Sequence, residues 1–368
     1  MKHNSVHVPR AVLGLAVLAT AVTVTACSDS STKVDHSAPA TGAGAAAAAS
    51  GSNGVIAFRR FTDATYSSSQ IVAARLDGSQ EKVLTNPGPE GADSIPTWSP
   101  DGSRLAFGRS VPRPDCGPGC FEKEIYVVDA HGGPATRLTH APGGALCSGQ
   151  GPSACAGDPA WSPDGKQIAF NRTMATASEP KDQTGIWVVN ADGAGEHLLA
   201  SRPEPQRTNS PAWSPDGTRL AFERGTFDNN QQALTLAVFT MRSDGTDERQ
   251  ITPSDRTFGD HPQWSPDGTT ILFRDNVGAP TNAFKPSALY TVHPDGSGLT
   301  NLTGSDPNLQ YLSGSFSPDG KSIVVPRVHR GSHGDQAELY VLSSAGAVQR
   351  LVVENPNWQS MVRWSPQP

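Results

Sequence analysis

The stretch Trp98-Ser99-Pro100-Asp101-Gly102 recurs along the chain and decides the fold class. Its copies are Trp98–Gly102, Trp161–Gly165, Trp213–Gly217, Trp264–Gly268, the variant Phe316–Gly320 and the truncated Trp364–Pro366. An Asp-Gly pair between apolar runs favours a tight turn that joins two strands. Repetition at a period of about 50 residues, with several short strands in each period, indicates a propeller or a solenoid.

Each period contains further strand-like runs. A run ending in an aromatic residue follows each Asp-Gly turn, as in Arg104–Phe107 and Gln167–Phe170. A third run such as Glu124–Asp129 and a short fourth run such as Thr136–Thr139 come next. Four antiparallel strands per period make the blade of a propeller.

The two ends of the repeat complement each other. The last copy lacks the strand that should follow Trp364-Ser365-Pro366, and the run Gly54–Arg60 has the form of that missing strand. We therefore expect an all-β fold over residues 54–368, a six-bladed β-propeller of four-stranded antiparallel blades. One blade is predicted to be shared by a C-terminal strand near Met361–Ser365 and three N-terminal strands, which leaves no open edge between the first and last blades.

Composition agrees with a single turn-rich β domain. The 368 residues include 37 Gly and 31 Pro, and the repeat extends over most of their length. The net charge is −6 and no long Lys/Arg run occurs, so the sequence offers no footprint for a nucleic-acid backbone. We expect a monomer that does not bind nucleic acid.

The N-terminus has the pattern of an export signal. Lys2 and Arg10 precede the apolar segment Ala11–Ala26, which is short for a membrane span. The small residues before Cys27 resemble the lipobox of bacterial lipoproteins, which implies removal of residues 1–26 and a lipid on Cys27. Residues 27–53 are rich in Ser, Ala and Gly and are predicted to be a flexible tether to the outer face of the bacterial cell membrane, in the cell envelope. Ordinary cleavage nearby, or an uncleaved anchor, remains the alternative.

Four cysteines remain once Cys27 is set aside. An even number in an exported chain indicates disulfides, and local pairing of Cys116 with Cys120 and of Cys147 with Cys155 is the first of three possible connectivities. A four-thiolate zinc site is the alternative, although the usual spacing of two residues between ligands is missing.

The repeat, with its later Ile-Tyr-Val-Val-Asp and Leu-Thr, resembles that of TolB-type β-propellers, which are related to WD repeats. The resemblance covers nearly all of residues 54–368 and implies the propeller fold. It carries little about function, because the same blade serves binding proteins, accessory domains of peptidases and some lyases.

Candidate site residues precede each tryptophan motif, where the innermost strand begins. They are Asp93, Asp158, Asn209, Asp260 and His261, and we expect them to ring the mouth of the central channel. Arginines follow the second strand of most blades at Arg60, Arg109, Arg172, Arg224 and Arg327. A tight hairpin should place Arg109 opposite Asp93 or Ser94, and Arg172 opposite Asp158.

Two interpretations of this ring stay open. The pairs could clamp the first two strands of each blade, or the ring could bind an acidic peptide, a carboxylated sugar or a cation. Asp260 with His261 is a weak metal candidate, and His329 with His333 is another. No cofactor is expected apart from such a channel-bound cation, and the sequence points to no catalytic residue.

The function that fits best is a lipid-anchored, extracytoplasmic binding or scaffold propeller. It would dock an envelope protein, peptide or glycan on its long-loop face and channel mouth. The alternative is a metal-assisted carbohydrate-active enzyme, since oligogalacturonate lyases have similar repeats. A prolyl oligopeptidase-like enzyme does not fit, because the chain has no Gly-x-Ser-x-Gly nucleophile motif.

Overall fold

The computed structural model describes residues 54–63, 67–88, 90–113, 120–141, 153–175, 185–201, 206–227, 233–253, 257–275, 286–330, 336–354 and 359–366. Contacts divide the chain into two units, Met1–Ser50 and Gly51–Pro368, and the described residues all belong to the second. Among them, no helix is long and apolar enough to cross a membrane.

Hydrogen bonding joins the described strands in four sheets of twelve, four, four and five strands, and the twelve-stranded sheet divides at two single parallel contacts into three sets of four. The strands are therefore described as six consecutive groups, antiparallel inside each group. The first is β25 (Gln359–Trp364), β1 (Val55–Phe61), β2 (Ser69–Arg75) and β3 (Lys82–Val83). The second is β4 (Ala92–Trp98), β5 (Arg104–Pro112), β6 (Phe121–Asp129) and β7 (Thr136–Arg137). The third is β8 (Ser153–Trp161), β9 (Gln167–Ala175), β10 (Gly185–Asn190) and β11 (His197–Ser201).

The remaining groups repeat the pattern. The fourth is β12 (Gln206–Trp213), β13 (Arg219–Phe227), β14 (Ala233–Arg242) and β15 (Arg249–Gln250). The fifth is β16 (Phe258–Trp264), β17 (Ile271–Asp275), β18 (Leu289–Val292) and β19 (Thr300–Asn301). The sixth is β20 (Leu309–Tyr311) with β21 (Ser315–Phe316), β22 (Ser322–His329), β23 (Gln336–Ser343) and β24 (Val348–Glu354).

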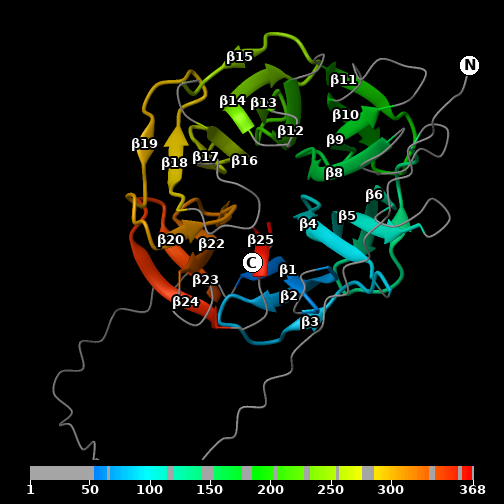
Figure 1. Ribbon diagram of the computed structural model, residues 1–368, viewed down its shortest axis with the longest axis horizontal. Helices are drawn as coiled ribbons and strands as arrows, with labels where there is room; N and C mark the ends of the chain where they lie inside the picture. Colours follow the sequence, from blue (N-terminus) through cyan, green and yellow to red (C-terminus); the bar gives the residue numbers. More distant parts are fainter. Residues whose placement is uncertain are drawn as a thin grey trace, which may run out of the picture. The chain divides into compact units, whose positions relative to one another are not determined.

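The groups surround a common centre, with β4, β8, β12, β16 and β25 nearest to it (Figure 1). Single parallel pairings, Ser69 with Ala92 and Lys123 with Cys155, join neighbouring groups. The expected second, third and fourth strands of each repeat are confirmed. The fold is therefore all-β and propeller-like.

The strands differ from the prediction in length. The predicted runs Arg104–Phe107 and Glu124–Asp129 are both longer in the structure, where β5 continues to Pro112 and β6 begins at Phe121. The two strands pair over nine residues, well past Phe107. In the sixth group the innermost strand is split, and β24 has seven residues where β3, β7, β15 and β19 have two.

The apolar core lies between neighbouring groups. Phe107 and Phe170 are fully buried, and the same is true of Phe58 and Phe222. One cluster joins Ile125 of β6 to Phe170 of β9, and another joins Phe58 of β1 to Val324 of β22. Each group is thus held to the next chiefly by hydrophobic burial.

The Ser-Pro-Asp-Gly turn is held by its own side chains. In the first copy the Ser99 hydroxyl donates to Asp101 (2.6 Å) and accepts from the Arg104 amide (2.9 Å), while Gly102 has φ +68°. The same bonds recur at Ser162, Ser214, Ser265 and Ser317. The motif is therefore explained by turn geometry, because a left-handed residue favours Gly and Asp accepts hydrogen bonds from nearby donors.

Successive turns also touch. A Cβ on Gly217 would lie 3.2 Å from Pro163 of the preceding turn, and one on Gly165 would lie 3.8 Å from Pro100. Gly268 and Gly320 lie in the same way over Pro215 and Pro266. The Pro and Gly of the motif therefore fix the spacing of neighbouring innermost strands.

Acid should destabilise the domain through these turns. Hydrogen bonds from Ser99 and Ser103 lower the pKa of Asp101 to about 2, and the corresponding serines lower the pKa of Asp164, Asp216, Asp267 and Asp319. A carboxyl whose pKa is depressed on folding contributes stability above its unfolded pKa and loses it as pH falls through the folded value. We expect the melting temperature to drop between about pH 4 and pH 2. In Asp101→Asn, which cannot ionise, the drop should be smaller, and a flat profile for the wild type would contradict the assignment.

Candidate functional site

Asp93 and Arg109 face each other across β4 and β5, as the sequence predicted. They are register partners, and Arg109 donates from Nε to Oδ1 (2.7 Å) and from Nη2 to Oδ2 (2.8 Å) of Asp93. The Asp93 side chain is fully buried. A bidentate pair of this kind fixes the two strands rather than presenting a free charge.

The other arginines of the row are also engaged inside the sheets. Arg60 pairs with Glu81, and Arg224 pairs with Glu248 and donates from Nε to Thr208 (3.0 Å). Three arginines of the row each lie over two aromatic rings, with the guanidinium carbon between 5.0 and 5.5 Å from the centroids: Arg109 over Phe107 and Tyr126, Arg172 over Phe170 and Trp187, and Arg224 over Phe222 and Phe239. These contacts support the clamp interpretation of the row.

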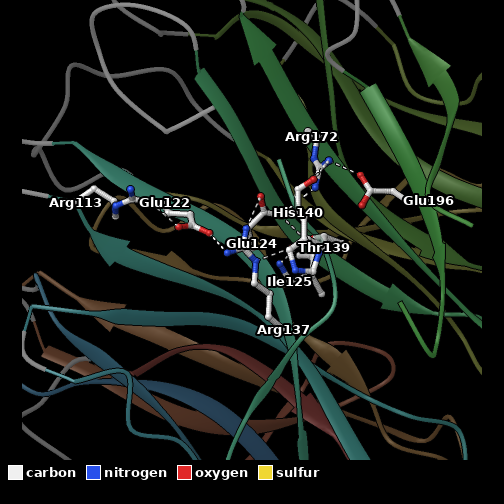
Figure 2. A network of polar contacts seen from close by, with 9 residues as sticks. All are labelled: Arg113, Glu122, Glu124, Ile125, Arg137, Thr139, His140, Arg172 and Glu196. Atoms are coloured by element: carbon white, nitrogen blue, oxygen red, sulfur yellow. Dashed lines mark hydrogen bonds and ion pairs between the residues drawn. The ribbon is translucent and has the colours of Figure 1, made fainter. Parts of the chain in front are cut away.

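Arg172 does not pair with Asp158, and that expectation was wrong. Its register partner in β8 is Ala156, which offers no acceptor. The guanidinium instead donates from Nη2 to Glu124 of β6 (3.0 Å) and pairs through Nη1 with Glu196. Figure 2 shows Arg172 between these two carboxylates.

Glu124 and Arg172 are the buried centre of a longer network (Figure 2). Thr139 donates to Glu124, whose other oxygen lies 3.6 Å from Arg137. Arg137 pairs in turn with Glu122, which also holds Arg113 (3.1 Å). Burial raises the pKa of Glu196, and the Arg172 charge opposes that rise. The network joins the second strand group to the third.

A cavity of about 150 Å³ lies among the innermost strands. Its lining includes Asp158, Ser210 and His261, which stand three residues before their tryptophans, and runs on to Trp161, Trp213 and Trp264. Asp158 accepts a hydrogen bond from the Ser210 hydroxyl (3.0 Å). Thr97, Gln263 and Arg363 add polar groups from β4, β16 and β25. Strands from distant parts of the chain therefore converge on one polar and aromatic cavity.

A repeated bulge aims these residues at the centre. Ile95, Asp158, Ser210 and His261 have φ between +50° and +53°, and the strand register shifts at each of them. Each is followed by a proline, which lacks the amide needed for the sheet ladder. A bulge with a left-handed residue redirects one side chain out of the normal alternation. The X-Pro dipeptide before these four tryptophans was the signal for Ile95, which sequence reasoning missed.

The remaining predicted residues are dispersed. Asn209 accepts a hydrogen bond from Asn171 (3.1 Å), and Asp260 lies in β16 as a register partner of Arg274, its side chain being outside the described part. Neither Asp93 nor the arginines Arg109, Arg172 and Arg224 line the cavity. Of the predicted ring, the cavity brings together Asp158 and His261.

Several predicted sites fall wholly or partly outside the described residues. Cys27, Cys116, Cys147 and His333 are among the residues that are not described. Cys120 and Cys155 are each disulfide-bonded, while their connectivity stays a prediction. His329 accepts from Arg327 Nε (3.1 Å). In the described ranges, no three His, Cys, Asp or Glu side chains gather as metal ligands would.

A comparison with known protein families agrees with the propeller repeat. The family described as TolB beta propeller domain matches residues 147–367, more than half of the chain. The chain belongs to the TolB β-propeller family. The structure of TolB from Acinetobacter baumannii superposes with a TM-score of 0.61 at 18% identity, covering 85% of this chain and 67% of that one. At that identity the likeness shows the shared fold.

Two curated relatives align with about half of this TolB-family chain. An uncharacterized peptidase of Bacillus subtilis, YuxL, is 26% identical over 193 residues, which cover 49% of this chain and 27% of the relative. The uncharacterized protein Atu1656 of Agrobacterium fabrum is 30% identical over 184 residues, which cover 48% of this chain and 52% of the relative. The chain thus spans about a quarter and about half of their lengths.

Breaking the buried network should be costly. Arg172→Met keeps much of the apolar volume but removes the nearer of the two cations of buried Glu124 and leaves only Arg137 at 3.6 Å, so the free energy of unfolding should fall by about 3–5 kcal/mol. Arg113→Met removes a cation from the exposed end of the same network and should cost about 1 kcal/mol or less. Urea denaturation of both variants measures the difference. Equal small losses in the free energy of unfolding would show that the network does not hold the second and third strand groups together.

Proposed function

We propose that this TolB-family propeller binds a protein partner by accepting a side chain or chain end of that partner in its central cavity. The observation that carries the proposal is the cavity between Asp158, Ser210 and His261, walled by three tryptophans. Convergent polar groups in a concave, aromatic site are the usual setting for ligand recognition. The TolB-like fold itself suits a binding or scaffold role.

The size of the cavity favours a peptide over a glycan. Its volume is about 150 Å³. Pockets for whole small molecules usually measure about 300–1,000 Å³. One side chain or chain end fits, whereas a sugar oligomer would have to lie outside, on the long loops.

The proposal includes a closed ring of six blades. Three observations support it: β25 pairs with β1, the Trp98 indole donates to Arg363 of β25 (3.3 Å), and the Trp364 amide donates to Ser315 of β21 (3.1 Å). The innermost terminal strand is thus bonded to the strand group on each side of it. A closed ring gives the cavity a complete wall, with Arg363 as part of the lining.

The proposal also places the propeller, residues 54–368, outside the cell membrane as a monomer. Residues 1–26 would direct export, Cys27 would carry lipid and residues 27–53 would be the tether, on the sequence pattern alone. Cys27→Ser should move the protein from the membrane fraction to the soluble fraction, and unchanged fractionation would contradict the anchor.

No observation favours the metal-assisted carbohydrate enzyme, so a single function is proposed.

A paired capture experiment tests the docking site. Asp158→Asn with Ser210→Ala removes the charge and the hydroxyl from the cavity, and Asp77→Asn with Ser79→Ala makes the same changes in an exposed turn. The tagged mature protein and the turn variant should capture the same envelope protein from detergent extract, and the cavity variant should lose it at an unchanged melting temperature. Undiminished capture by the cavity variant would place docking elsewhere.

A further inference from the structure

Neighbouring strand groups meet at a repeated pair of positions. One is the residue after the buried aromatic of the second strand, and the other stands four residues before the Trp of the next group. Asn171 and Asn209 occupy this pair between the third and fourth groups and are hydrogen-bonded. Between the second and third groups the pair is Gly108 and Gly157, and a Cβ on Gly108 would lie 3.8 Å from the Gly157 Cα.

Lys123 fills the space that the two glycines leave. Its Cε lies 3.5 Å from the position of a Cβ on Gly108, and its Nζ lies 3.1 Å from the position of a Cβ on Gly157. Strand alternation turns Lys123 to the opposite face of β6 from Glu122 and Glu124, which hold the arginines of the network. Among the described residues, no carboxylate forms an ion pair with Lys123.

Arg59 is a second cation without such a partner in the described part of the chain. Its Nε donates to the Ser69 hydroxyl (3.0 Å), which donates to the Asp93 carbonyl (2.8 Å), and its guanidinium lies 4.1 Å from the Phe61 centroid. Burial lowers the pKa of Arg59 to about 10, and the Asp93 charge opposes this, so the guanidinium is charged at neutral pH. The Asp93 carboxylate itself is taken by both bonds from Arg109.

Ser94 lies close to Lys123 and directly follows Asp93 in β4, whose carbonyl accepts the hydrogen bond from the Ser69 that holds Arg59. The Ser94 hydroxyl lies 3.4 Å from the same Gly108 Cβ position that Lys123 Cε approaches. We name Arg59, Ser94 and Lys123 the cationic corner. Because Arg109 already holds the Asp93 carboxylate, that carboxylate does not form an ion pair with Arg59 or Lys123 in the described part of the chain. All three residues of the corner are half-buried, so solvent reaches them.

We propose that the cationic corner binds a carboxylate of the docked partner, either an acidic side chain or a free chain end. Arg59 supplies a planar fork, Lys123 a point charge and Ser94 a hydroxyl donor, which together match the acceptors of a carboxylate. The corner lies near the end of β1 and the starts of β4 and β6, away from the Ser-Pro-Asp-Gly turns. The inference rests on the proposed function only in assigning the carboxylate to a protein partner.

The test uses a defined probe on the mature full chain in detergent. The probe is a fluorescein-labelled peptide of four glutamates with an amidated end, compared with its four-glutamine counterpart and with the same glutamate peptide carrying a free end. The wild type should bind both glutamate peptides more tightly than the glutamine peptide. Tighter binding of the peptide with the free end would identify a chain terminus as the preferred source of the carboxylate. Equal binding of glutamate and glutamine peptides would overturn the proposal.

Variants locate the site. Lys123→Gln and Arg59→Gln should each weaken glutamate-peptide binding by about tenfold, the usual cost of losing a charged hydrogen bond. Lys166→Gln, which removes an exposed lysine from a turn, is the matched control and should leave it unchanged. Equal effects of Lys123→Gln and Lys166→Gln would overturn the assignment.

One further measurement uses the wild type alone, so it does not depend on any variant being folded. The preference for glutamate over glutamine should disappear as salt rises from about 0.05 to 0.5 M, because screening weakens exposed charge pairs. A preference that persists at high salt would contradict a charged site. The probe does not depend on Asp158 or Ser210, so the cationic corner and the cavity can fail independently.

Discussion

The contact between successive Ser-Pro-Asp-Gly turns, together with the apolar core between neighbouring strand groups, is the constraint that places the innermost strands. Each turn closes on itself through a serine hydroxyl, as Ser99 does on Asp101 and Arg104. Its glycine then lies over the proline of the turn before, as Gly217 does over Pro163. The motif therefore sets both the hairpin inside a group and the spacing to the next group, and the core phenylalanines fill the space so defined.

That spacing explains how side chains divide between structure and recognition. The innermost strands are close enough for their bulges to bring Asp158, Ser210 and His261 to one cavity. The second strands place their arginines between aromatic rings and carboxylates, where Arg109 and Arg224 form ion pairs that hold strands together. The polar groups that we propose for binding are the cavity residues and the cationic corner.

Local pattern was enough to predict the strand order, the turns and the Asp93–Arg109 pair. Those features depend on residues within one repeat, where hairpin register fixes which side chains face each other. The partner of Arg172 was mispredicted. The residue opposite it in the sheet is Ala156, which has no side-chain acceptor, and its actual partner, Glu124, belongs to another strand group. The cavity was only half predicted, because a bulge shifts the alternation by one residue and is marked in sequence only by the proline before Trp.

The central claim is that strands from both ends of the chain complete one ring around the cavity. Deleting residues 362–368 removes the second half of β25, its bonds to Trp98 and Ser315, and two of its four register pairs with β1, whereas deleting residues 367–368 leaves them intact. The melting temperature of both truncations is the direct measurement. The account predicts a large loss of melting temperature for the first and none for the second. An unchanged melting temperature after removal of 362–368 would contradict it.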